Sequence, residues 1–216
     1  MKNLLDLENG LRRVFNNFIN FATVEKMTQK FDKKVFTASL LTKDLGILLY
    51  NLPHIIGSLR SKKISKAFKE KIMIVVTAVN GCIYCAWFHA KQAVSSGISE
   101  DEVKNMLNLQ FKADASDFET MGLLYAQHYA ETNRNPNEEM KARLFEYYGE
   151  KTAKHIILII RMIFFGNLSG NTFDAFLSRL RGNKAQNSNV IFELFFFIFT
   201  APFLIPLIPF TKKIQN

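Results

Sequence analysis

Cysteine is scarce in this sequence: its 216 residues include two cysteines, and both lie in one short stretch, Cys82-Ile-Tyr-Cys85. In a reducing compartment an isolated C-x-x-C is more typical of redox chemistry or metal binding than of a structural disulfide. A signal-peptide pattern is also missing, because charged and polar residues interrupt the apolar positions of the first thirty residues. We therefore expect a cytoplasmic protein.

Acidic residues are outnumbered, with 19 Asp and Glu against 28 Lys and Arg, and the net charge is +9. Basic residues cluster at 60–71, 179–184 and 212–213. A nucleic-acid-binding surface would combine such clusters with interleaved aromatic residues, and the sequence shows no such pattern. We expect no nucleic-acid partner and interpret the clusters as solvated surfaces, with contact to an anionic membrane as the alternative.

Convincing strand pairs are absent, whereas helical spacing of apolar residues recurs along the whole chain, which predicts an all-α fold. The run 72–79 is rich in β-branched residues and could be a buried strand, but its lysine-rich lead-in favours a buried helix. Leu52-Pro53 should end or kink a helix. We expect helices over 1–35, 42–59, 65–79, from Asn80-Gly81 to Gly97, and over 99–109, 114–132, 137–148 and 151–165, the last one closed by Gly166-Asn167.

A histidine, His89, follows the second cysteine by one helical turn. At about 100° per residue, positions 82, 85 and 89 fall within about 60° of a helix surface, so two thiols and an imidazole share one face. A thiol near a base and a helix N-terminus ionises more readily, and a second thiol three residues earlier can close a disulfide. This arrangement suits reversible thiol chemistry.

A carboxylate, Glu70, lies twelve positions before Cys82. On one continuous helix the two would be about 18 Å apart. A turn at Asn80-Gly81 would fold the chain back and bring Glu70 level with His89. We therefore predict that Glu70 orients His89, directly or through water, and that His89 acts on Cys85.

The spacing of Glu70, Cys82-x-x-Cys85 and His89 resembles the signature of the AhpD-like alkylhydroperoxidases, within the carboxymuconolactone decarboxylase family. The flanking segments 52–56, 80–85 and 97–100 are similar to the family's as well, and the resemblance covers about 40–180. It implies an AhpD-like helical bundle that is oligomeric, a homo-trimer or homo-hexamer. We assign 1–39 to an N-terminal helical extension, 40–183 to the family domain and 184–216 to a hydrophobic C-terminal arm or membrane-associated tail.

The resemblance implies a thiol-dependent alkylhydroperoxide reductase or disulfide oxidoreductase that uses no cofactor or metal. In it, Cys85 attacks the peroxide, Cys82 resolves the sulfenic acid into a disulfide, and His89 with Glu70 relays the proton. The substrate would be a hydroperoxide or a disulfide, and the electron donor a dithiol of lipoyl type or a thioredoxin-like protein. Tyr84 stands where some family members have a second histidine, and we interpret it as a packed aromatic residue, with a phenol donor as the alternative.

Several alternatives stay open at this point. Thioredoxin-like reasoning makes Cys82 the attacking thiol, because it lies nearer the helix N-terminus. The C-x-x-C with His89 could also supply three zinc ligands, although no fourth is near in sequence. A lactone decarboxylase like the family's namesake has no evident need for a C-x-x-C. A non-enzymatic scaffold or membrane-associated protein of the same fold is the alternative from a different class.

The C-terminal stretch 190–210 is almost entirely apolar, but Glu193 and three prolines do not suit a regular membrane-spanning helix. It could pack as an arm on neighbouring subunits, lie on a membrane surface as a peripheral contact, or span the membrane. Arg161 interrupts another apolar helix, and we expect it to have a buried partner, to form an ion pair near the site or between subunits, or to lie at the rim of the core.

Overall fold

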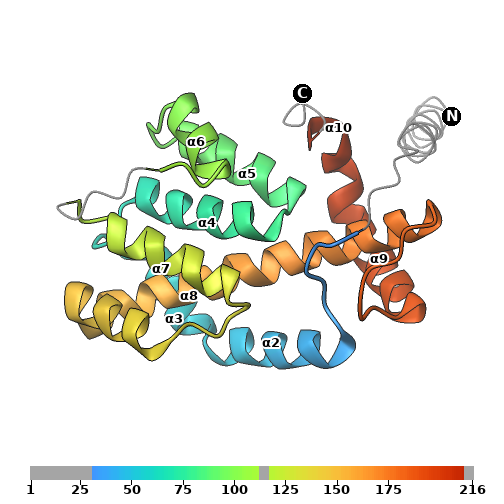
Figure 1. Cartoon of the computed structure of the whole chain (residues 1–216), viewed down its shortest axis with the longest axis horizontal. Coiled ribbons are helices and arrows are strands. Elements are labelled where there is room, and N and C mark those ends of the chain that lie inside the picture. The colour runs from blue at the N-terminus through green and yellow to red at the C-terminus, as the bar shows by residue number, and fades with distance from the viewer. Residues whose placement is uncertain (1–30, 112–116, 212–216) are drawn as a thin grey trace, which may run out of the picture.

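The computed structural model describes residues 31–111 and 117–211, and in these residues every regular element is a helix (Figure 1). The all-α prediction is confirmed. The helices are α2 (Ala38–Tyr50), α3 (Leu52–Arg60), α4 (Lys66–Asn80), α5 (Ile83–Val94), α6 (Glu100–Leu107), α7 (Thr120–Glu131), α8 (Glu138–Leu180), α9 (Val190–Leu204), the 3₁₀ helix η1 (Ile205–Leu207) and α10 (Ile208–Thr211).

Helix α4 occupies the centre of the bundle, with α5 and α6 on one side and α7 and α8 on the other (Figure 1). Ser65 caps its start, because the Ser65 hydroxyl accepts a 2.9 Å hydrogen bond from the backbone N–H of Phe68. The β-branched run is buried nearly completely, and Ile72, Ile74 and Val75 have no exposed surface. Helix neighbours on every side, rather than strand propensity, decide the conformation of this run.

Two predicted boundaries near the N-terminus can be compared with the structure. The break at Leu52-Pro53 is confirmed: α2 ends at Tyr50, and α3 begins at Leu52 with Pro53 in its first turn. The predicted helix over 1–35 is wrong at its end, since residues 31–37 form no helix and Thr37 caps the start of α2. Its remaining residues lie outside the described part of the chain.

The long helix α8 corrects another prediction. Gly166-Asn167 was expected to end a helix there, yet α8 continues to Leu180. The break at Gly149, where φ is +71°, agrees with the gap between the predicted helices 137–148 and 151–165. Asn167 does not compete for the helix backbone, because its side-chain oxygen accepts a 3.0 Å hydrogen bond from the Thr77 hydroxyl on α4.

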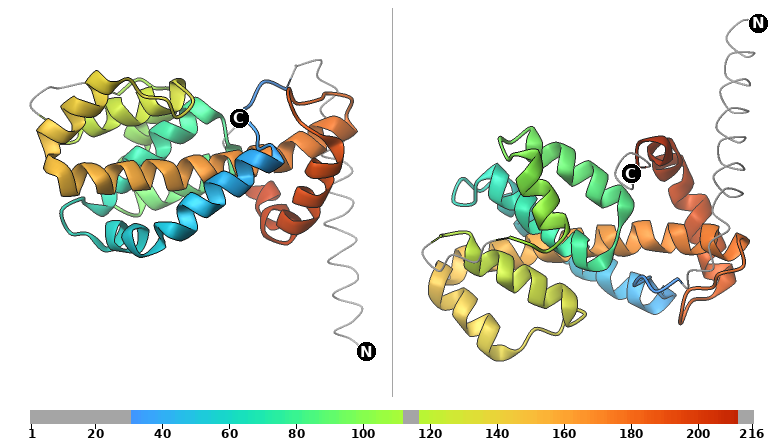
Figure 2. Two further views of the ribbon diagram at one scale, coloured as in Figure 1. Left: turned by 90° about the horizontal axis from the view of Figure 1, so that it is seen from below. Right: turned by 45° about the horizontal axis from the view of Figure 1, so that its top comes forward.

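The C-terminal segment α9–η1–α10 lies along the C-terminal end of α8, at one end of the molecule (Figures 1 and 2). Helix α9 continues through Pro202 and gives way to η1 at Ile205. Helix α10 contacts α5, and the ring of Phe210 stacks on Trp87 with a 5.4 Å centroid distance. The segment therefore joins α8 to the helix that follows the C-x-x-C.

Candidate active site

The two cysteines lie at the start of α5, directly after a tight turn. Gly81 ends α4 in the left-handed conformation, with φ of +69°, which glycine adopts without steric cost. Cys82 then caps α5, and its Sγ accepts a hydrogen bond from the backbone N–H of Cys85, with a 3.4 Å distance. Helix α5 therefore begins at Ile83. The predicted helical spacing of positions 82, 85 and 89 had included Cys82 in the helix.

The two sulfur atoms contact each other, with a 2.8 Å hydrogen bond between Cys82 Sγ and Cys85 Sγ. Both cysteines are free thiols in the structure. They differ in access, because Cys82 is 1% exposed whereas Cys85 is half-buried. A reagent from solvent would therefore meet Cys85 first.

The buried thiol is covered by α8 at a glycine. A Cβ atom at Gly170 would lie 2.6 Å from Cys82 Sγ and 3.2 Å from the ring of Tyr84. Only a residue without a side chain lets α8 approach the dithiol this closely. No local pattern pointed to Gly170, because it is 88 positions from Cys82 along the chain.

Glu70 and His89 form the contact that the turn at residues 80–81 predicted. His89 Nδ1 lies 2.8 Å from Glu70 Oε2, and both side chains are largely buried. With Nδ1–H donating to the carboxylate, the lone pair of Nε2 is free to accept a proton. In the described residues His89 makes no hydrogen bond to Cys85, so proton transfer between them would need a water molecule or a side-chain rotation.

Electrostatics at the thiol pair keep Cys85 protonated. The hydrogen bond with Cys82 raises the pKa of the Cys85 thiol well above its ordinary value of 9.0, and burial, the charge of a Cys82 thiolate and the carboxylate of Asp174 act in the same direction. Cys85 therefore needs a base before it can attack as a thiolate.

Asp174 enters this site from α8. Tyr84 donates a 2.7 Å hydrogen bond to Asp174 Oδ1, and Lys33 Nζ forms a 3.1 Å ion pair with Oδ2. Burial, followed by the charge of Asp174, raises the pKa of the Tyr84 phenol well above 10.0. Tyr84 is 3% exposed and packs edge-on against Phe173, so the interpretation of Tyr84 as a packed aromatic residue fits its surroundings.

The turn before the dithiol is also fixed from α8. The side-chain amide of Asn171, which is fully buried, donates to the backbone carbonyl of Asn80 at 2.8 Å and to that of Lys34 at 3.1 Å. Satisfying the last carbonyl of α4 holds the chain in position for Gly81 and Cys82. Sequence reasoning missed Asn171 as well, because its partner is 91 residues away.

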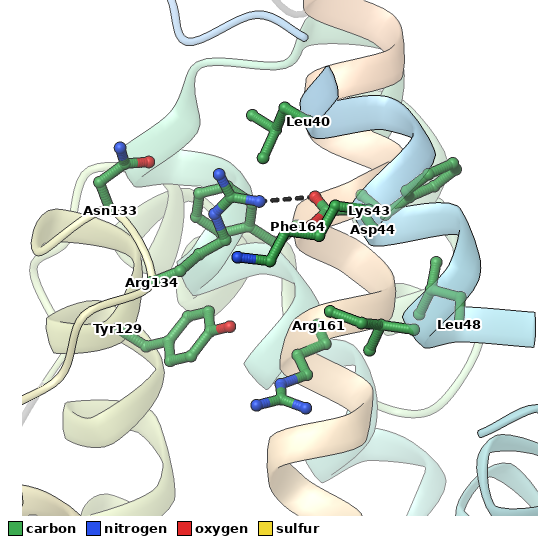
Figure 3. A pocket seen from close by; sticks show the side chains of 11 residues that line it. Leu40, Lys43, Asp44, Leu48, Tyr129, Asn133, Arg134, Arg161 and Phe164 are labelled. Carbon is green, nitrogen blue, oxygen red and sulfur yellow. Dashed lines mark hydrogen bonds and ion pairs between the residues drawn. The ribbon is translucent and has the colours of Figure 1, made fainter. Parts of the chain in front are cut away.

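A cavity of about 300 Å³ lies elsewhere, between α2, α7 and α8, and Figure 3 shows its lining. None of the four predicted site residues borders it. Arg161 is exposed and lines this cavity, which fits the predicted position at the rim of the core and not a buried partner. Beside it, Arg134 NH1 pairs with Asp44 Oδ2 at 2.5 Å. This cavity is separate from the thiol chemistry.

The described residues contain no group of three or more His, Cys, Asp or Glu side chains placed to hold a metal ion. The elements of a thiol site are present: one half-buried and one buried cysteine with their sulfurs in contact, and a histidine hydrogen-bonded to a carboxylate. Together with the bundle, these features define a class of all-α proteins with a C-x-x-C dithiol beside a histidine–glutamate pair.

One protein-family model matches a segment of the chain. The model of the carboxymuconolactone decarboxylase family matches residues 54–117, which contain Glu70, Cys82, Cys85 and His89. This segment of the chain is therefore similar to that family, which includes the AhpD-like proteins. No curated protein and no solved structure shows significant similarity to the chain.

Proposed function

We propose that this protein is a thiol-dependent hydroperoxide reductase that uses Cys82 and Cys85 as a redox couple. The observation that carries the proposal is the 2.8 Å contact between one buried and one accessible sulfur. Two thiol sulfurs in contact are suited to reversible two-electron chemistry. The hydrogen-bonded pair of His89 on α5 and Glu70 on α4 also supports the proposal.

In the proposed reaction the accessible thiol reacts first. His89, with Nδ1–H held by Glu70, takes the Cys85 proton at Nε2, through water or after a side-chain rotation, and the Cys85 thiolate attacks one peroxide oxygen. The O–O bond breaks, the other oxygen leaves as an alcohol after taking a proton, and Cys85 becomes a sulfenic acid. The raised pKa of Cys85 makes such a base necessary.

The second step uses the buried thiol. Cys82 Sγ attacks Cys85 Sγ of the sulfenic acid, an S–S bond forms, and the oxygen leaves as water with the Cys82 proton. An external dithiol, of lipoyl type or in a thioredoxin-like protein, then reduces the disulfide and is itself oxidised. Burial of Cys82 suits a resolving thiol, because it meets Cys85 and little else.

Peroxide consumption with a dithiol donor tests this proposal. We expect turnover by the wild type, complete loss in Cys85→Ser, and a sulfenic acid without a disulfide in Cys82→Ser. Glu70→Gln removes the carboxylate that orients the base His89. It should slow turnover by about 10²–10⁴-fold without changing the thiol count. Equal turnover in the wild type and Cys85→Ser would contradict the proposal and favour a non-enzymatic role for the fold.

A further inference from the structure

The C-terminal segment presents a broad apolar surface, which we call the C-terminal face. Every residue between 190 and 211 that is exposed has a purely hydrocarbon side chain. The face comprises Val190, Ile191, Leu194, Phe195, Ile198, Phe199, Pro202, Phe203, Pro206, Pro209 and Phe210. Phe195, Phe199 and Phe203 are 69%, 78% and 72% exposed, which is unusual for phenylalanine in a folded domain.

The one charge in this segment points inward. Glu193 is fully buried, and both of its oxygens accept hydrogen bonds from Arg179 on α8, at 2.5 Å from Nε and 2.9 Å from NH2. Burial acts to raise the pKa of Glu193, but the hydrogen bonds and charge of Arg179, together with Ser188, outweigh it and lower that pKa. The pair anchors α9 to the bundle and leaves the opposite side of α9 without any charge.

The C-terminal face has the chemistry of a lipid-facing surface rather than of a protein interface. Protein interfaces have a polar rim and about one hydrogen bond per 100–200 Å². Here the exposed side chains include no donor or acceptor, and the hydroxyl of half-buried Thr200 donates to the Phe196 carbonyl at 2.8 Å. Hydrocarbon chains require no hydrogen-bonding partner, so they complement this surface.

Charge at both ends of the segment favours an anionic membrane. Lys184 is exposed just before α9, and the sequence continues after α10 with Lys212-Lys213, in a chain whose net charge is +9. Basic residues beside an apolar face are attracted to anionic headgroups, at roughly 1 kcal/mol per residue near the surface. The apolar and basic features therefore point to the same partner.

We propose that the C-terminal face docks on an anionic lipid bilayer and lies in its interface. Two described helices, 138–180 and 190–211, are long and apolar enough to cross a membrane, but the first is mostly buried in the core. In the second, the regular α-helix α9 covers 15 residues, about 22 Å, before η1 interrupts it, so its unbroken part is shorter than the ~30 Å hydrocarbon core. One of its sides is bound to α8, so lipid contacts the other side alone.

Flotation with vesicles tests the proposal on the purified full-length protein. The probes are phosphatidylcholine vesicles with and without phosphatidylglycerol. We expect the wild type to float with the anionic vesicles, and the double substitution Phe195→Glu/Phe199→Glu to reduce the bound fraction at least about tenfold. The matched control is Leu49→Glu/Tyr50→Glu, which changes two residues that are 60% and 85% exposed on α2 and should float like the wild type.

Three results would overturn the proposal. The first is flotation of the α9 variant at the wild-type level, with circular dichroism showing both proteins folded. The second is a wild type that stays unbound while light scattering shows an oligomer that Phe195→Glu/Phe199→Glu dissociates, since the face would then be a subunit interface. The third is resistance of the bound protein to alkaline carbonate extraction, which would indicate a spanning segment.

Discussion

At the residue scale, the two thiols are distinguished by their surroundings. Cys82 is buried under Gly170 and caps α5, whereas Cys85 is half-buried and has a raised pKa. The positive end of the α5 dipole favours ionisation of Cys82, which would make Cys82 the attacking thiol, whereas accessibility to solvent favours Cys85. A peroxide must reach the sulfur that it oxidises, so we give accessibility the greater weight and assign the attack to Cys85.

The pKa of Cys85 is predicted to depend on its neighbour. Replacing Cys82 with alanine removes the hydrogen bond and the charge that raise the Cys85 pKa, so the pKa should fall toward 9.0. Alkylation of Cys85 by iodoacetamide at pH 8 should then be faster, by about tenfold per unit of pKa lost. Mass spectrometry of the Cys85 peptide over a pH series measures the rate, and an unchanged or slower rate would contradict the assigned cause.

Gly170 offers a steric prediction with a control on the same helix. Gly170→Ala places a methyl group 2.6 Å from Cys82 Sγ, and we expect it to destabilise the fold by about 1–3 kcal/mol and to slow disulfide formation. Gly166→Ala meets no atom within 4 Å and should stabilise α8 by about 0.5–1 kcal/mol. Urea unfolding of both variants measures these effects, and equal stability of the two would refute the packing argument.

These residues show which part of the site could be predicted. Glu70, Cys82, Cys85 and His89 lie within twenty residues and are related by helix periodicity and one turn, so the Glu70–His89 contact followed from their spacing. Gly170, Asn171 and Asp174 reach the site from α8, about 90 positions away. The spacing of residues within one segment does not predict a contact between helices that are distant in sequence. A glycine or asparagine within a helix does not indicate which residue it contacts.

At the element scale, the same limit applies to α8. The gap between the predicted helices 137–148 and 151–165 agrees with the observed break at Gly149, whereas the boundary predicted at Gly166-Asn167 is wrong. The structure breaks the helix at Gly149, while Asn167 turns its side chain toward Thr77 on α4 and leaves the backbone helical. The presence and type of helices α4 to α7 could be predicted. The continuation of α8 through Asn167 could not, because it depends on the contact of Asn167 with α4.

The attachment of α9 to α8 gives a pH-dependent prediction. The folded-state pKa of Glu193 is lowered, so its ion pair with Arg179 contributes stability above the ordinary value of 4.5, and this contribution is lost as the pH falls below that value. Glu193→Gln should therefore destabilise the protein by about 2–3 kcal/mol at pH 7. Its difference from the wild type should shrink on acidification.

Urea unfolding at pH 7 and at pH 3.5 to 5 measures this difference. The exposed pair Lys154–Glu150, whose two side chains are 60% and 75% exposed, supplies the matched control, since Glu150→Gln should change stability little at any pH. A Glu193→Gln effect that stays constant with pH would show that the lost contribution is packing and not the charge of Glu193.

At the scale of the whole molecule, two regions of different chemistry meet at α5. Its start holds the dithiol, and Trp87 on the same helix stacks on Phe210 of the C-terminal segment. The cluster of buried residues around Cys82 and Tyr84 includes Ile208 of α10, and Leu204 and Ile205 pack against it. Membrane docking through the C-terminal face would therefore bring the thiol pair close to the bilayer surface.

The central claim is that the two sulfur atoms form one reversible redox couple, and a thiol count tests it most directly. The reduced protein is titrated for free thiols before and after one equivalent of an alkyl hydroperoxide, and the product is digested and mapped. The account predicts loss of both thiols per chain and a Cys82–Cys85 disulfide that a dithiol reverses. Two free thiols after treatment, or a singly oxidised Cys85 that forms no disulfide with Cys82, would contradict it.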